Sequence, residues 1–158
     1  MKRILLTFVL AALAFGCKSK SATATKLDRN SQVMMKGTWT VDRVTTPASN
    51  YVKVTALQLA DAACFEGSTW KFISNNNKGE MALNGGAGCP SFSSPITWFV
   101  NREGQFVLKV LNAGEKAKKV RDGYILGVQN QSENEFELYE TLDIAGKPSK
   151  VVYHFRRN

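Results

Sequence analysis

Histidine and cysteine are scarce in this chain of 158 residues, which contains one histidine, His154, and three cysteines. A zinc site needs about four cysteine, histidine or carboxylate ligands at close spacing, and a nucleophilic cysteine needs a base and an orienting partner. A single histidine far along the chain completes neither set. We therefore expect no metal, no cofactor and no catalytic residue, and we interpret His154 as a surface residue of a strand.

Motifs for other chemistries are also missing. The glycine-rich stretch GGAG at 85–88 lacks the Lys and the Ser or Thr of a phosphate-binding loop. The carboxylates Glu66, Glu80 and Asp122 show no pairing and are expected at the surface. The basic cluster KAKKVR at 116–121 has no interleaved aromatic residues and matches no nucleic-acid-binding module. We expect neither an enzyme nor a nucleic-acid partner, and we interpret the formal charge of +8 as a solvated surface facing anionic head groups.

An apolar run near the N-terminus has the layout of a secretory signal. Residues 1–16, MKRILLTFVLAALAFG, begin with two positive charges, and a small residue precedes Cys17. The run is too short to span a bilayer as a permanent helix. AFGC resembles a lipobox, in which the cysteine is lipidated and becomes the mature N-terminus, and an ordinary signal peptide cleaved nearby is the alternative. We expect residues 1–16 to be removed and Cys17 to carry the lipid.

The residues that follow predict a membrane-anchored protein with one domain. Residues 17–35 are rich in Ser, Thr and Lys, as expected of a flexible tether. Residues 36–158 suffice for one ordinary globular core and not for two. Lys18 without an acidic cluster, by resemblance to Gram-negative lipoproteins, predicts an outer-membrane lipoprotein facing the periplasm. The predicted partner is therefore the membrane, through the N-terminal lipid.

Export would leave Cys64 and Cys89 in an oxidising compartment, where two thiols can pair. The sequence predicts a hairpin with strands at 68–74 and 78–84, joined by a turn, NNNKG, that tolerates positive φ. The two cysteines lie just beyond the outer ends of this hairpin. Closing a loop of about 26 residues contributes roughly 3.5 kcal/mol in the chain-entropy model. We predict a disulfide between Cys64 and Cys89.

From residue 36 onward, short alternating segments are separated by Gly, Asn and charged turns. Trp39 and Val41, for example, alternate with polar neighbours at the period of a half-buried strand. Residues 57–67 are the one segment that favours a helical turn, and 51–55 are a candidate for a short extra strand. The eight predicted strands cover residues 37–44, 68–74, 78–84, 95–101, 105–111, 123–131, 135–142 and 150–156. Short turns between consecutive antiparallel strands favour an all-β, eight-stranded up-and-down barrel, which leaves no exposed edge.

Several of these segments resemble the lipocalin-like lipoproteins of Gram-negative envelopes. The likeness covers about residues 34–156, and its motifs are GTWTVDRVT at 37–45, CFEGSTWKFISNNNKGEM at 64–81, SPITWFV at 94–100 and GQFVLKV at 104–110. The resemblance implies a calycin-type barrel. In such barrels, Gly37 would begin the first strand, Trp39 would plug the closed end, and a basic residue late in the last strand would pack over Trp39. Arg156, which we assign to the motif, and Arg157 are both candidates for this role, and the sequence does not decide between them.

Strand alternation also predicts which residues face the barrel axis. The predicted inner set is Trp39, Val41, Trp70, Phe72, Met81, Leu83, Ile96, Trp98, Val100, Phe106, Leu108, Val110, Phe136, Leu138, Val151, Tyr153 and Phe155. An eight-stranded barrel is just wide enough to be filled by side chains or to hold one small ligand. If a cavity exists, the candidates to line it are Trp70, Phe72, Trp98, Phe106, Tyr124 and Tyr139, all of which could equally be packing residues.

Two functions remain open at this point. The first is the binding or transport of a small hydrophobic molecule by an anchored, non-enzymatic barrel. The second is a structural or interaction module of the envelope, with a side-chain-filled barrel and no ligand. Fold alone does not decide between them.

Overall fold

The computed structural model describes residues 29–47, 53–86, 88–112 and 123–158. The expected signal segment 1–16, Cys17 and the basic cluster at 116–121 lie outside these ranges. Within them, no helix has the length and apolar character needed to cross a membrane.

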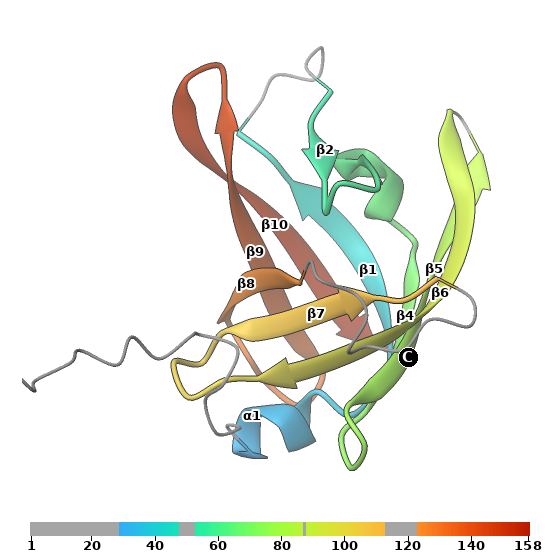
Figure 1. Ribbon diagram of the computed structural model, residues 1–158, viewed down its shortest axis with the longest axis vertical. Coiled ribbons are helices and arrows are strands. Elements are labelled where there is room, and N and C mark those ends of the chain that lie inside the picture. Colours follow the sequence, from blue (N-terminus) through green and yellow to red (C-terminus); the bar gives the residue numbers. More distant parts are fainter. Residues whose placement is uncertain (1–28, 48–52, 87, 113–122) are drawn as a thin grey trace, which may run out of the picture.

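Eight antiparallel strands close into a barrel in which each strand pairs with its neighbours in sequence, and the last strand pairs with the first (Figure 1). These strands are β1 (Gly37–Thr45), β4 (Thr69–Ile73), β5 (Lys78–Gly86), β6 (Cys89–Val100), β7 (Phe106–Val110), β8 (Tyr124–Gln129), β9 (Glu135–Ile144) and β10 (Lys147–Arg157). The predicted all-β, eight-stranded up-and-down barrel is confirmed.

The β9–β10 hairpin illustrates how local sequence sets the connections. Ile144 pairs with Lys147, so only Ala145 and Gly146 form the turn. Both have positive φ, +55° and +78°, as a turn that follows the right-handed twist of the strands requires. The carboxylate of Asp143 accepts a hydrogen bond from the Gly146 N–H at 2.7 Å and completes the turn.

The segment between β1 and β4 folds over one end of the barrel. It contains β2 (Thr55–Ala56), β3 (Ala60–Asp61) and the 3₁₀ helix η2 (Ala62–Phe65), which begins with the Asp61 side chain accepting from the Ala63 N–H. The helical turn expected within 57–67 is therefore present. Of the short strand expected at 51–55, only Thr55 is in a strand, and 51 and 52 lie outside the described residues.

Buried contacts and a disulfide hold this segment in place. Leu57 and Phe65 are buried, and the Phe65 ring meets the Tyr153 ring edge to face at 5.5 Å. Cys64 and Cys89 form the predicted disulfide, with their Cα atoms 5.4 Å apart. The disulfide therefore ties η2 to the first residue of β6.

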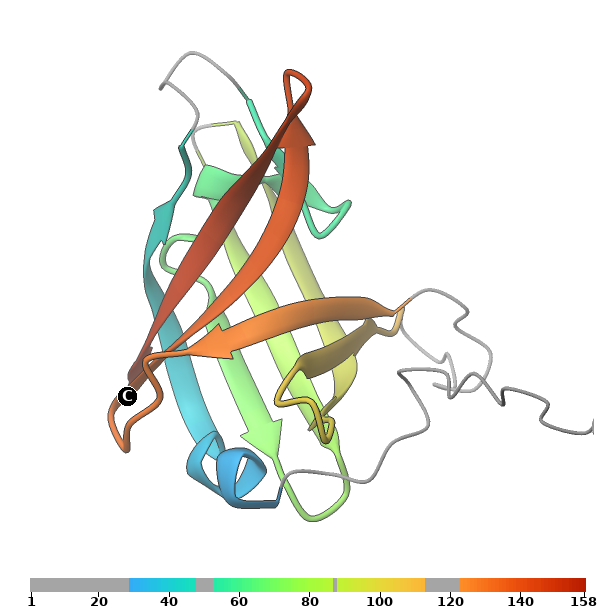
Figure 2. The same cartoon turned by 90° about the vertical axis from the view of Figure 1, so that its left-hand side faces the viewer.

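The other end of the barrel is covered by α1 (Arg29–Met34), which lies opposite η2 in both views (Figures 1 and 2). Gln32 and Met35 are buried, and the Met35 carbonyl accepts a hydrogen bond from the indole of Trp39 at 2.8 Å. Residues 29–35 were expected to belong to the flexible tether, and this expectation is wrong. A helix this short depends on tertiary contacts, and here the barrel end supplies them.

Seven aromatic rings in contact with one another fill the barrel interior: Trp39, Trp70, Phe72, Trp98, Phe106, Phe136 and Phe155. Each is at most 2% exposed. Every residue of the predicted inner set is buried except Val110, which is half-buried. Alternation thus identified most of the core of the strands. It missed Leu126 in β8 and Val107 in β7, and the buried residues contributed by α1 and by the β2–η2 segment.

Candidate functional site

The barrel-end motif consists of Gly37, Trp39 and Arg157. The Arg157 guanidinium lies 4.2 Å from the centre of the Trp39 ring and donates to the carbonyls of Met34 and Lys36 at 2.8 and 2.9 Å. A Cβ at Gly37 would lie 2.6 Å from this guanidinium, and Gly37 has φ of +133°. Glycine is therefore favoured there by its conformation, and a side chain would displace the guanidinium from Trp39.

Of the two arginines left open for covering Trp39, Arg157 takes the role, and the assignment of Arg156 to the motif is wrong. Its guanidinium points outward and pairs with Asp42 at 2.8 Å. Alternation in β10 predicts Arg157 for this role, because Tyr153 and Phe155 face inward and the next inward position is Arg157. The motif stabilises this end of the barrel and holds α1.

Four of the six candidate ligand-lining residues lie within the packed core: Trp70, Phe72, Trp98 and Phe106. Buried indoles usually need a hydrogen-bond partner, and these have one. Trp70 donates to the hydroxyl of Ser68 at 3.0 Å, and Trp98 donates to the carbonyl of Lys78 at 2.9 Å. With the Trp39 bond, the donors of all three tryptophans in the chain are satisfied by the protein itself.

The two tyrosines among the candidates lie on opposite faces of the wall. Tyr124 is half-buried and packs against the core. Tyr139 lies outside, where its ring covers Gly127 so closely that a Cβ there would be 2.0 Å from the ring, and the ammonium of Lys150 sits 4.0 Å from its centre. The expectation that Tyr139 lines an interior cavity is therefore wrong, as its neighbours Phe136 and Leu138 on the inner face already implied.

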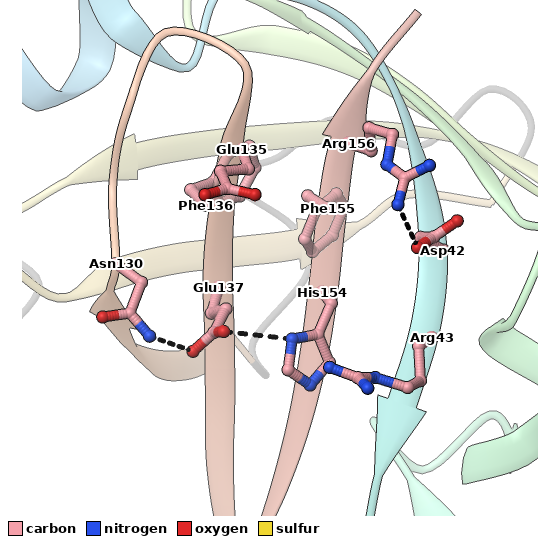
Figure 3. Close-up of a pocket in the computed structure, with 9 residues that line it drawn as sticks. All are labelled: Asp42, Arg43, Asn130, Glu135, Phe136, Glu137, His154, Phe155 and Arg156. Carbon is pink, nitrogen blue, oxygen red and sulfur yellow. Dashed lines mark hydrogen bonds and ion pairs between the residues drawn. The ribbon is translucent and has the colours of Figure 1, made fainter.

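The described hollow that gathers the most charged side chains is a groove of about 270 Å³ on the outer face of β1, β10 and β9 (Figure 3). Its charged and titratable residues are Asp42, Arg43, Glu135, Glu137, His154 and Arg156. The groove therefore lies on the wall of the barrel and not in its interior.

A β-bulge in β1 creates this arrangement. Val41 pairs with Phe155 and Arg43 pairs with His154, so Asp42 is an extra residue in the ladder. Strict alternation from Trp39 would point Arg43 inward, but the bulge turns both Asp42 and Arg43 to the outer face. The carboxylate of Glu66 accepts the N–H of Val44 just beyond the bulge at 2.9 Å, which connects the groove to the end of η2.

Glu137 is the most fully bonded carboxylate of the groove. It accepts from Gln129 at 2.7 Å and from Asn130 at 2.8 Å, and it lies 3.0 Å from Nδ1 of His154. Partial burial raises the pKa of Glu137, but these hydrogen bonds and the charge of His154 outweigh it and lower the pKa below its ordinary value. Glu137 is therefore held as a carboxylate.

His154 is fixed on both sides of its ring. A carboxylate only accepts, so Nδ1 carries the proton donated to Glu137. In the neutral ring Nε2 then accepts from the hydroxyl of Thr45, at 2.9 Å. His154 is half-buried, so it is a cross-strand link in the groove wall and not the bare surface residue expected from sequence. Within the described ranges, no three His, Cys, Asp or Glu side chains form a group that could hold a metal ion.

Compared with known proteins, the chain matches no protein-family model and no curated protein sequence. The closed eight-stranded antiparallel barrel is consistent with a calycin-like fold.

Proposed function

We propose that this protein is a non-enzymatic binding module of the cell envelope, anchored through a lipid on Cys17 to the outer membrane and facing the periplasm. Its barrel interior serves as structural core, and its outer groove is the binding surface. The observation that carries this proposal is the aromatic filling of the barrel. A core in which seven rings contact one another and every indole donor is satisfied has the properties of packing, not of an empty pocket.

The groove is the better candidate for binding because its side chains are organised by features that the barrel does not need for closure. The bulge interrupts the β1–β10 ladder, and three contacts stabilise the result: Asp42 with Arg156, Glu137 with His154, and Glu66 with the backbone of Val44. Bulges often re-aim side chains beside functional sites.

A small hydrophobic ligand, as in lipocalins, is the second candidate, and one observation favours it. β8 pairs with β9 only through residues 127–129, while its first half pairs with β7. The inner-facing Tyr124, Val128 and Leu142 around this divergence are half-buried. An apolar molecule bound against these three side chains would make the protein a carrier at the membrane.

Native mass spectrometry of the full-length protein, purified from its own membranes and followed by lipid extraction, separates the two candidates. The proposed module carries acyl chains on Cys17 and no second molecule. A stoichiometric hydrophobic molecule, released by Val128→Trp or Leu142→Trp, would favour the carrier instead. An unmodified Cys17 on the mature protein would refute the anchor.

Site-specific photo-cross-linking in the periplasm tests the groove. A photoreactive residue at Asn158, which adjoins β1 through Thr40, is compared with one at the exposed Ser91 of β6. We expect a discrete adduct from position 158 that Arg43→Gln suppresses and none from position 91. Equal labelling at both positions, or labelling unaffected by Arg43→Gln, would contradict the proposal.

A further inference from the structure

Two charged side chains of the groove, Arg43 and Glu135, have no hydrogen-bond or ion-pair partner in the part of the chain that the structure describes. The other charged side chains have partners: Asp42 pairs with Arg156, and Glu137 contacts His154. Figure 3 shows Arg43 and Glu135 at diagonally opposite corners of the groove. The site therefore offers one unpaired cation and one unpaired anion, separated by the Asp42–Arg156 ion pair and the Glu137–His154 contact.

The ladder fixes how far apart these two residues are. Arg43 pairs with His154, and Glu135 pairs with Arg156, so they are two residues apart along β10 and two strands apart across the sheet. Strand geometry places their Cα atoms about 12 Å apart. An extended peptide covers about 3.3–3.6 Å per residue, so the ends of a tripeptide are about 10 Å apart, a span that the two side chains can bridge.

The charge balance of the groove limits the ligand. Two arginines and three carboxylates line it, so the charges of these five side chains sum to −1. A dianion would meet repulsion from these carboxylates, whereas a ligand that carries one charge of each sign finds a partner for both. The planar fork of an arginine matches a carboxylate with two parallel hydrogen bonds, and a lone carboxylate suits an ammonium group.

We infer that the groove binds the free termini of a short zwitterionic peptide, with Arg43 holding its carboxylate and Glu135 its ammonium group. This inference rests on the proposed function of the groove as the binding surface. The peptide lies diagonally across β10, over the Asp42–Arg156 and Glu137–His154 contacts of the groove floor.

Isothermal titration of the full mature protein in detergent, at pH 7, with trialanine tests this inference. C-terminal amidation or N-terminal acetylation of the peptide each removes one charge, and we expect each to weaken binding by about tenfold or more. Arg43→Gln should remove the effect of amidation and Glu135→Gln the effect of acetylation. The matched controls are Arg102→Gln and Glu103→Gln, which change exposed charges in the β6–β7 turn and should bind trialanine as the wild type does.

A double exchange gives a readout that a merely structural role would not produce. Arg43→Glu with Glu135→Arg keeps both charges and reverses their order, so it should restore the binding that either single exchange abolishes. Equal binding of the amidated and free peptides, or preferential binding of glycerophosphoethanolamine, would overturn the inference. If trialanine does not bind while the Arg43-dependent cross-link at position 158 persists, the peptide inference fails and the proposed function stands; if both are absent, both fail.

Discussion

Replacing Cys64 and Cys89 with alanine removes the covalent link between η2 and β6. The two residues are 25 positions apart, so the unfolded chain loses a closed loop of about 26 residues. In the chain-entropy model this loop is worth roughly 3.5 kcal/mol at 25 °C. Domains of this size have free energies of unfolding of about 5–15 kcal/mol. The variant should therefore remain folded, but with a much smaller free energy of unfolding. With an unfolding entropy of about 2.1 cal/mol/K per residue, the midpoint temperature of thermal unfolding should fall by roughly 13 °C.

Urea unfolding followed by tryptophan fluorescence measures the global effect, because all three indoles are buried in the folded barrel. Hydrogen exchange measures the local one. The N–H groups of Ala62 and Glu66 bond within the segment that the disulfide holds, to Val54 and Ala63. They should lose protection by more than the amides of the β9–β10 ladder, since the disulfide is their segment's covalent attachment to the wall. Wild-type protein reduced with a phosphine is the control, and it should behave as the double variant does.

A loss below about 1 kcal/mol, at an unchanged dependence on urea, would refute this reasoning. It would mean that the Phe65 and Leu57 contacts hold the segment without help, and that the unfolded chain gains little freedom when the link is removed. If hydrogen-exchange protection were lost evenly over all strands, the disulfide would not act mainly on the segment around η2. The predicted loss of global stability would be unaffected by that result.

Three further perturbations test individual contacts. Arg157→Ala removes the cation over Trp39 and three hydrogen bonds to backbone carbonyls, so it should lower the free energy of unfolding in urea by about 2 kcal/mol. Arg156→Ala removes only an exposed ion pair with Asp42 and should lower it by less than about 1 kcal/mol. The lowered pKa of Glu137 means that its stabilisation is present above the unfolded value of 4.5 and is lost as pH falls below it, so Glu137→Gln should flatten the acid limb of the stability profile. Burial and the charge of Glu140 raise the pKa of Tyr153, so its stabilisation should be lost as pH rises above 10, and Tyr153→Phe should flatten that alkaline limb relative to wild type.

Strand order and most inward-facing residues were predictable because large apolar residues alternate with polar ones in most strands. The runs FVLKV of β7 and YILGVQ of β8 are the exceptions, and Leu126 was missed there. The ends of β6 and β10 were harder to predict from the sequence, and both strands contain proline. Pro90, Pro95 and Pro148 lie inside β6 and β10, although proline normally argues against a strand. The predicted strands begin at residues 95 and 150, whereas the structure begins them at Cys89 and Lys147. Pro95 has no N–H to donate, and the hydroxyl of Ser94 donates to the Leu111 carbonyl instead, while the Pro95 carbonyl still accepts from the Leu111 N–H at 2.9 Å.

Segment 29–35 was misread for a different physical reason. It is polar and short, and six residues do not form a stable helix alone. Its helical state depends on Trp39 donating to the Met35 carbonyl and on Arg157 donating to the Met34 carbonyl. Arg157 is more than a hundred residues away in the sequence, so no local pattern could have revealed the contact.

The groove depends on such non-local contacts even more strongly. Alternation in β9 and β10 puts Glu137 and His154 on the outer face, and this half of the site could have been derived from sequence. The other half depends on one extra residue in β1, which moves Arg43 from the inner face to the outer face. That shift is stabilised by Glu66, from the end of η2, and η2 is held in turn by the disulfide to β6. Reducing the disulfide should therefore weaken peptide binding at Arg43, although no residue of the groove is changed. An unchanged peptide affinity in the reduced protein would show that the bulge does not depend on η2.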